Sequence, residues 1–221
     1  MLRFITRTTT PLLAFGLGFA AFPYRKSVRD TKLQHINEDI AQKILSSNQA
    51  QELINDPEWE QVISSNTFPH QHKKNYVSRG LLMGPNLFEI DPIIYMNPTK
   101  GEFVGFYHLG SKLVSQDGRV HNGVVATLLD EGLCACGFPR LPSTKGVTAQ
   151  LALNFENEAD PETTVVLRAK IIEARGRKVV SGGTLESFDP EGKTQPHVIA
   201  SGKVVLVEPN WFKYFRWVQP V

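Results

Sequence analysis

A run of apolar residues from 122 to about 138 constrains the fold more than any other segment of this 221-residue chain. Apolar side chains cover nearly every side of the helix that it predicts, which is typical of a helix buried inside a domain. Gly137 and Pro139 are expected to end the helix. Two acidic residues, Asp130 and Glu131, interrupt the apolar run. A carboxylate in such surroundings is costly unless it has a partner or a chemical role.

Four predicted strands follow this helix and one precedes it. Their residues are apolar and β-branched, with a period of two, and short breaks rich in Gly, Pro and Asp separate the later ones. The five segments are residues 103–109, 147–155, 163–172, 178–188 and 198–207. Two short apolar runs, Leu81–Met83 and Ile93–Tyr95, are further strand candidates. An antiparallel sheet with one apolar face would wrap the helix, so the predicted fold class is α+β.

The segment before the sheet is predicted to be a helical extension. Residues 31–66 are polar with an intermittent apolar side, and Asn37 is a suitable helix N-cap. A basic loop with His70 and His72 follows. A His-x-His pair can bind a metal ion, but no third ligand is near in the sequence, so we favour a solvated loop. No metal and no cofactor is expected.

The first 30 residues have the composition of a mitochondrial targeting segment. They are basic and rich in threonine, with no acidic residue before Asp30. Residues 12–22 are almost wholly apolar, which is short for a membrane span of about 20 residues. Cleavage of the segment and membrane association through residues 8–24 both remain open, and a secretory signal is a third interpretation. The expected location is the mitochondrion, in the matrix or at the inner membrane.

Several other classes of function lack support in the sequence. The net charge is +2 and no basic stripe is interleaved with aromatic residues, so no nucleic-acid partner is expected. Cys134 and Cys136 are the two cysteines, and two thiols alone do not make a zinc site. The sequence contains no Gly-x-Ser-x-Gly motif, no phosphate-binding loop and no dinucleotide fingerprint.

The start of the buried helix and Asp130 together carry the candidate chemistry. Backbone N–H groups at Asn122 and Gly123 have no partner within the helix and, with the helix dipole, can hold a developing oxyanion. Asp130 can act as a general base toward water or attack a carbonyl directly. Glu131 is the competing carboxylate, about 100° around the helix, and periodicity does not choose between the two. Thr148 opens the next strand, on its polar face with Gln150, and its hydroxyl could bond the carboxylate.

These residues resemble the signature of the PaaI-like and THEM-type acyl-CoA thioesterases of the hotdog superfamily. That signature is His-Gly-Gly, a hydrophobic helix with an Asp nine residues after the His, and a Ser or Thr eighteen residues after the Asp. Here it reads His121-Asn122-Gly123 with Asp130 and Thr148 at the matching places. The sequence departs from the pattern at Asn122, where the family has Gly. The resemblance spans about residues 102–207 and extends to small fungal mitochondrial proteins with this domain.

The resemblance implies a hotdog fold, in which an antiparallel sheet wraps around a long central helix. It also implies an acyl-CoA substrate, hydrolysis to a carboxylic acid and CoA, and catalytic roles for the five signature residues. The site would lie between two subunits of a homodimer or homotetramer. The alternative is a non-catalytic hotdog protein that binds acyl-CoA or acts as a scaffold, which the Asn at 122 favours. The expected parts are a targeting segment (1–30), a helical extension (31–80), a thioesterase domain (81–208) and an aromatic tail (209–221).

Overall fold

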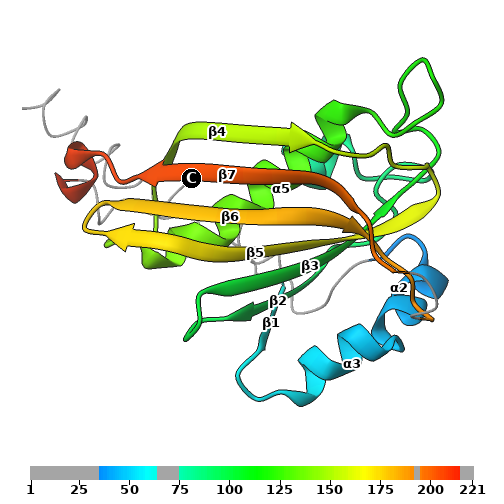
Figure 1. Cartoon of the computed structure of the whole chain (residues 1–221), viewed down its shortest axis with the longest axis horizontal. Coiled ribbons are helices and arrows are strands. Elements are labelled where there is room, and N and C mark those ends of the chain that lie inside the picture. The colour runs from blue at the N-terminus through cyan, green and yellow to red at the C-terminus, as the bar shows by residue number, and fades with distance from the viewer. Residues whose placement is uncertain (1–34, 64–74, 192–194, 215–221) are drawn as a thin grey trace, which may run out of the picture.

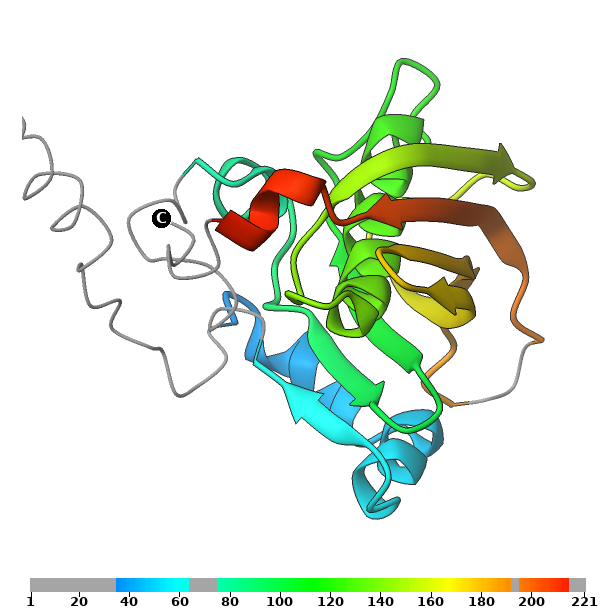
Figure 2. The same ribbon diagram turned by 90° about the vertical axis from the view of Figure 1, so that its left-hand side faces the viewer.

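A long helix, α5 (Asn122–Gly137), packs on a seven-stranded antiparallel sheet (Figure 1). This arrangement is seen in a computed structural model that describes residues 35–63, 75–191 and 195–214. The strands are β1 (Glu60–Val62), β2 (Ile93–Asn97), β3 (Glu102–Leu109), β4 (Val147–Phe155), β5 (Thr163–Arg175), β6 (Lys178–Ser187) and β7 (Val198–Val207). Their order across the sheet is β1-β2-β3-β5-β6-β7-β4. Seen nearly along α5, the sheet curves around the helix (Figure 2). The predicted α+β fold with a central helix is confirmed.

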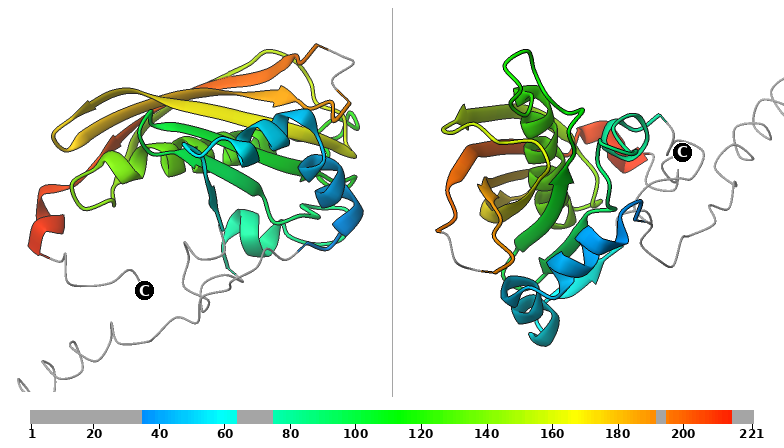
Figure 3. Two further views of the ribbon diagram at one scale, coloured as in Figure 1. Left: turned by 90° about the horizontal axis from the view of Figure 1, so that it is seen from below. Right: turned by 90° about the vertical axis from the view of Figure 1, so that its right-hand side faces the viewer.

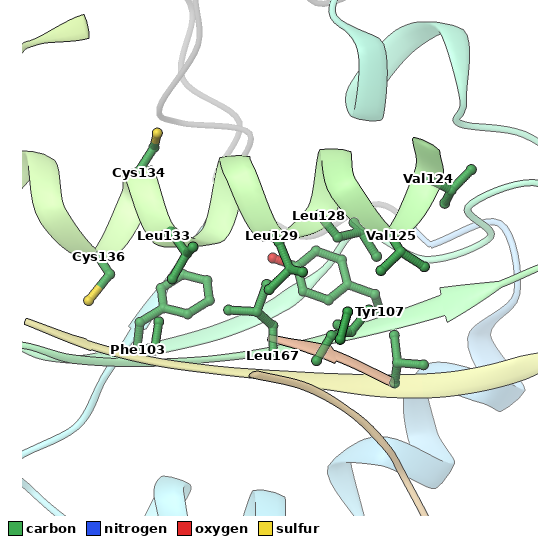
Figure 4. Close-up of a cluster of buried hydrophobic side chains, with 14 of the residues drawn as sticks. Phe103, Tyr107, Val124, Val125, Leu128, Leu129, Leu133, Cys134, Cys136 and Leu167 are labelled. Atoms are coloured by element: carbon green, nitrogen blue, oxygen red, sulfur yellow. The ribbon is translucent and has the colours of Figure 1, made fainter. Parts of the chain in front are cut away.

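The main core lies between α5 and the concave face of the sheet. Leu128, Leu129 and Leu133 of α5 are less than 2% exposed, and they point toward Phe103 and Leu167 on the strands (Figure 4). Full burial of each of these leucines stabilises the fold by roughly 1.5–3 kcal/mol. The apolar composition of the 122–138 segment therefore holds α5 in place along its whole length.

The helical extension covers the other face of the sheet. It consists of α2 (Glu38–Leu45) and α3 (Asn48–Asn55), which lie against the convex side near β1 to β3 (Figure 3). Asn37 caps α2 as predicted, since its side chain accepts a bond from the Ile40 N–H at 3.4 Å. A second core joins this extension to the sheet. Strand β3 is buried along nearly all of its length because both of its faces are covered.

Two segments of the extension differ from the sequence prediction. Residues 60–62 form the short edge strand β1 rather than helix. Leu81–Met83 was predicted to be a strand. Instead, Leu81 is the last residue of a π-helical turn, η3 (Val77–Leu81), and the next two residues come directly after that turn. Polar contacts to distant parts of the chain hold this turn. Ser78 donates to the Glu131 carboxylate at 2.5 Å, and buried Arg79 forms an ion pair with Asp91 at 2.8 Å.

Several expectations concern residues outside the described ranges. The targeting segment 1–30 and the His70/His72 loop are among them, so both stay predictions. Within the described ranges, no helix has the length and apolar character that a membrane crossing requires. Part of the aromatic tail is described as η5 (Asn210–Tyr214), in which the rings of Trp211 and Tyr214 are exposed.

Candidate active site

The start of α5 is an exposed turn closed by its own capping residue. His121 is the N-cap, and its Nδ1 accepts a hydrogen bond from the Gly123 N–H at 2.8 Å. The N–H groups of Val124 and Val125 are directed to the His121 carbonyl. Among the described residues, the Asn122 N–H has no acceptor. Of the two predicted oxyanion donors, one is therefore engaged within the chain and the other is available.

A hollow of about 750 Å³ lies beside this helix start. Its lining includes His121 and the loop residues Ser115 and Asp117. Ser115 precedes His121 by six residues. Here its hydroxyl bonds Asp117 and the Arg119 carbonyl, so it stabilises the loop rather than pointing freely into the hollow.

Two turns further along α5, Asp130 meets the beginning of β4. The Thr148 hydroxyl donates to Asp130 Oδ1 at 3.5 Å, although eighteen residues separate the two in sequence. Asp130 is half-buried and Thr148 is exposed, so the pair is accessible from solvent. The structure thus brings together the two side chains whose spacing the sequence singled out.

A β-bulge directs Thr148 toward Asp130. Thr148 pairs with Leu206 of β7, whereas Gln150 pairs with the next residue, Val205, so that Ala149 is an extra residue. Cross-strand partners share a face of the sheet, and Leu206 belongs to the core beneath α5. Thr148 therefore faces α5, and the predicted polar face shared with Gln150 is wrong. Bulges beside active sites commonly redirect a side chain in this way.

The Cys134 thiol is a third group beside Asp130 and Thr148, and its place in the site was not predicted from the sequence. Its Sγ lies 3.3 Å from Thr148 Oγ1 and donates to Asp130 Oδ1 at 3.7 Å. Burial raises the pKa of this thiol to about 12, so it is protonated at neutral pH. Cys136 points to the opposite side of α5 (Figure 4). The four-residue spacing between Asp130 and Cys134, which places both on one side of a helix, was the available signal.

Glu131 has a different environment from Asp130. Its carboxylate accepts the Ser78 hydroxyl bond at 2.5 Å beneath η3. Burial raises the pKa of Glu131, while the bond from Ser78 and the positive charge of Arg79 oppose that rise. Glu131 is therefore engaged in holding η3 on α5. Asp130 is the carboxylate that faces Thr148.

The helix start and Asp130 are too far apart to serve one substrate carbonyl within a single chain. Eight residues separate Asn122 from Asp130, which corresponds to about 12 Å along the helix axis. A reacting carbonyl has to lie about 3 Å from both its nucleophile and its oxyanion donors. Asn122 and Asp130 are therefore two candidate half-sites that one chain cannot bring to the same carbonyl.

Comparison with known families tests the resemblance directly. Residues 117–192, which include α5, Asp130 and Thr148, match the sequence profile of the family described as "Thioesterase superfamily". Residues 117–192 form a thioesterase superfamily domain. A solved structure described as a putative thioesterase, a phenylacetic acid degradation-related protein from Ralstonia eutropha JMP134, is 19% identical. It aligns over 53% of this chain and 84% of its own, with a TM-score of 0.46.

The relatives with higher identity are fungal proteins, one of which is named as mitochondrial. A protein of Candida albicans named "Uncharacterized protein, mitochondrial" is 55% identical over 99% of this chain and 100% of its own length. MIOREX complex component 3 of Saccharomyces cerevisiae is 38% identical over 87% of this chain and 78% of its own. The sequence similarity to fungal relatives therefore includes the N-terminal extension as well as the thioesterase superfamily domain.

Proposed function

We propose that the protein hydrolyses acyl-CoA thioesters to a free carboxylic acid and CoA. The observation that carries the proposal is the Asp130–Thr148 contact at 3.5 Å, at the positions where the resembled enzymes keep an Asp and a Ser or Thr. Membership of the thioesterase superfamily supports the reaction class. No cofactor is required, because a carboxylate and a water molecule provide the chemistry.

In the proposed reaction, Asp130 removes a proton from a water molecule that the Thr148 hydroxyl helps to orient. The water oxygen attacks the thioester carbonyl, and the tetrahedral oxyanion rests on the Asn122 N–H and the positive end of the α5 dipole. The carbon–sulfur bond then breaks, and the proton leaves with the CoA thiolate. Direct attack by the Asp130 carboxylate, followed by hydrolysis of the anhydride, uses the same residues.

The roughly 12 Å separation of the half-sites leads us to propose a shared site in a homodimer. In the described part of the chain, β4 has a ladder partner on one side, at β7, and its other edge is open. Val147 and Phe155, at its ends, are 46% and 44% exposed. Open apolar strand edges favour pairing with another chain. Two chains joined at β4 would place Asp130 of one opposite the helix start of the other, and two such dimers could form a tetramer.

One observation favours the alternative of a non-catalytic acyl-CoA-binding or scaffold protein. The Gly123 N–H is bonded to His121 Nδ1, so a single backbone donor remains available for an oxyanion. The name of the yeast relative, MIOREX complex component 3, is also that of a complex subunit. The two functions are separated by measuring CoA thiol release with a chromogenic disulfide reagent across acyl chain lengths. Acyl-CoA binding without thiol release would support the alternative.

We expect Thr148→Ala to lower kcat by about tenfold while KM changes less than threefold, because a group that orients water acts mainly in the transition state. Thr163→Ala, a strand threonine on β5, is a matched control with unchanged kinetics. Steady-state thiol release measures both variants. An unchanged kcat for Thr148→Ala would mean that Thr148 has only a structural role in the sheet.

We propose a mitochondrial location, matrix or inner-membrane associated, that depends on the first 30 residues. The mitochondrial names of the fungal relatives support the compartment. A fusion of residues 1–30 to a fluorescent protein is expected to enter mitochondria, since the segment is basic and lacks acidic residues before Asp30. Changing Arg3 and Arg7 to Glu should leave the fusion in the cytosol.

Carbonate extraction of the full-length protein then separates a matrix form from an anchored one. Cytosolic fluorescence of the unchanged fusion would refute the prediction.

A further inference from the structure

A second cavity, of about 630 Å³, lies on the convex face of the sheet, which faces away from α5. Leu53 of α3 and Trp59, just before β1, form one wall. The strands provide the rest of the lining, notably Arg168, Lys170 and Gly182. The extension therefore turns a part of the sheet's outer face into a hollow that is open to solvent. Its volume is within the range of about 300–1,000 Å³ that small-molecule sites occupy.

The strand register explains both the floor and the charge of this cavity. Lys170 of β5 and Lys203 of β7 both pair with Gly182 of β6, so the three residues share the convex face. Glycine has no side chain, so the floor between the two lysines is backbone, and the Ile172 side chain reaches over it. A Cβ at Gly182 would meet Ile172 Cδ1 at 2.7 Å, and that atom is the movable end of an exposed side chain.

The lining combines an apolar wall with two cations, Arg168 and Lys170, and one carboxylate, Glu102, which is the cross-strand partner of Lys170. Leu53 and Trp59 are partly buried and pack against the core of the extension. The Arg168 guanidinium is held in place by Gln49 Oε1 at 2.9 Å and, more loosely, by Glu186 Oε2 at 3.6 Å. Lys170 is exposed and has neither an ion pair nor a hydrogen bond among the described residues. A fixed guanidinium next to an available ammonium is suited to an anionic group.

We propose that this cavity binds a single-chain amphiphile with an anionic head group. The head group lies on Lys170 and Arg168, and the apolar chain lies along Trp59 and Leu53. A fatty carboxylate and an alkyl phosphate share this chemistry, and both are probes for the site. The site is separate from Asp130, since the sheet lies between them. The inference does not rest on the thioesterase proposal, because binding is measured without turnover.

The test is calorimetric titration of the full-length protein with decanoate, decyl phosphate, decanol and decyltrimethylammonium, each below its micelle concentration. We expect decanoate or decyl phosphate to bind at least about tenfold more tightly than decanol, because the head group bonds to charged donors. The cationic amphiphile should not bind. The anion that binds more tightly shows whether the ligand carries a carboxylate or a phosphate head group. Equal affinity for decanol and both anions would overturn the proposal.

Variants locate the bound ligand. Lys170→Gln should weaken anion binding at least about tenfold, and Gly182→Leu should abolish it by filling the floor. Lys203→Gln is the matched control, because Lys203 also pairs with Gly182 but does not line the cavity. Thermal melts establish that each variant is folded. Equal effects of Lys170→Gln and Lys203→Gln, or binding lost in Asp130→Asn but kept in Lys170→Gln, would contradict the assignment.

Discussion

Asp130→Asn is expected to lower kcat for thioester hydrolysis by at least about 100-fold and to leave the fold intact. The asparagine side chain keeps the shape and one oxygen, so the Thr148 hydroxyl and the Cys134 thiol keep an acceptor. What the substitution removes is the group that takes a proton from water or attacks the carbonyl. Thiol release at saturating acyl-CoA measures kcat, and circular dichroism measures the fold.

Glu131→Gln is the matched control for this substitution. It neutralises the adjacent carboxylate, which is bonded to Ser78 rather than to Thr148. Because burial raises the pKa of Glu131, its charged form is disfavoured in the folded protein, and a neutral amide should keep or improve stability at pH 7. Activity should stay within about threefold of the wild type. A reversed result, with Glu131→Gln inactive and Asp130→Asn active, would move the catalytic role to Glu131.

Asn122→Pro is expected to lower kcat by about 100- to 1,000-fold, the effect typical of losing one oxyanion donor. Proline has no N–H, and the first helical position accepts it readily. The preceding residue, His121, already has the extended backbone that a following proline requires, with φ −64° and ψ 129°. The substitution therefore removes one N–H group at little structural cost. Thiol release and a thermal melt are the measurements.

Asn122→Gly completes the comparison, because it keeps the N–H and removes the side chain. If the backbone N–H holds the oxyanion, this variant should keep or raise activity, since the approach to the helix start becomes less crowded. If Asn122→Gly loses as much activity as Asn122→Pro, the donor is the side-chain amide. Wild-type activity in both variants would exclude Asn122 from the oxyanion site.

Long periodic segments were predictable from the sequence. The bounds of β4 and β7 and the start of α5 agree with the prediction, because their periodicity reflects burial against a single core. Asn37 was predictable as a cap because capping is a local interaction. Asp130 and Thr148 were also predicted as a pair, because their spacing matches the signature of the resembled family.

The remaining features depend on contacts that no local pattern encodes. A single extra residue at Ala149 turns Thr148 toward α5, and a bulge leaves no periodic signal in so short a strand. The π-helical turn η3 is held by bonds to Glu131 and Asp91, which are 53 and 12 residues away in sequence. The same Ser78 contact separates the roles of Glu131 and Asp130, a choice that helical periodicity left open.

Complementation between two inactive variants tests the shared site most directly. Asp130→Asn chains and Asn122→Pro chains are refolded together, and mixed dimers are isolated by two different affinity tags. Each mixed dimer would contain one intact site and one site with both defects. An unselected equal mixture should therefore recover about a quarter of wild-type thiol release, because half of its dimers are mixed. We predict this recovery, with about half of wild-type activity in the purified mixed dimers. Folded mixed dimers that remain as inactive as the two parent variants would contradict it.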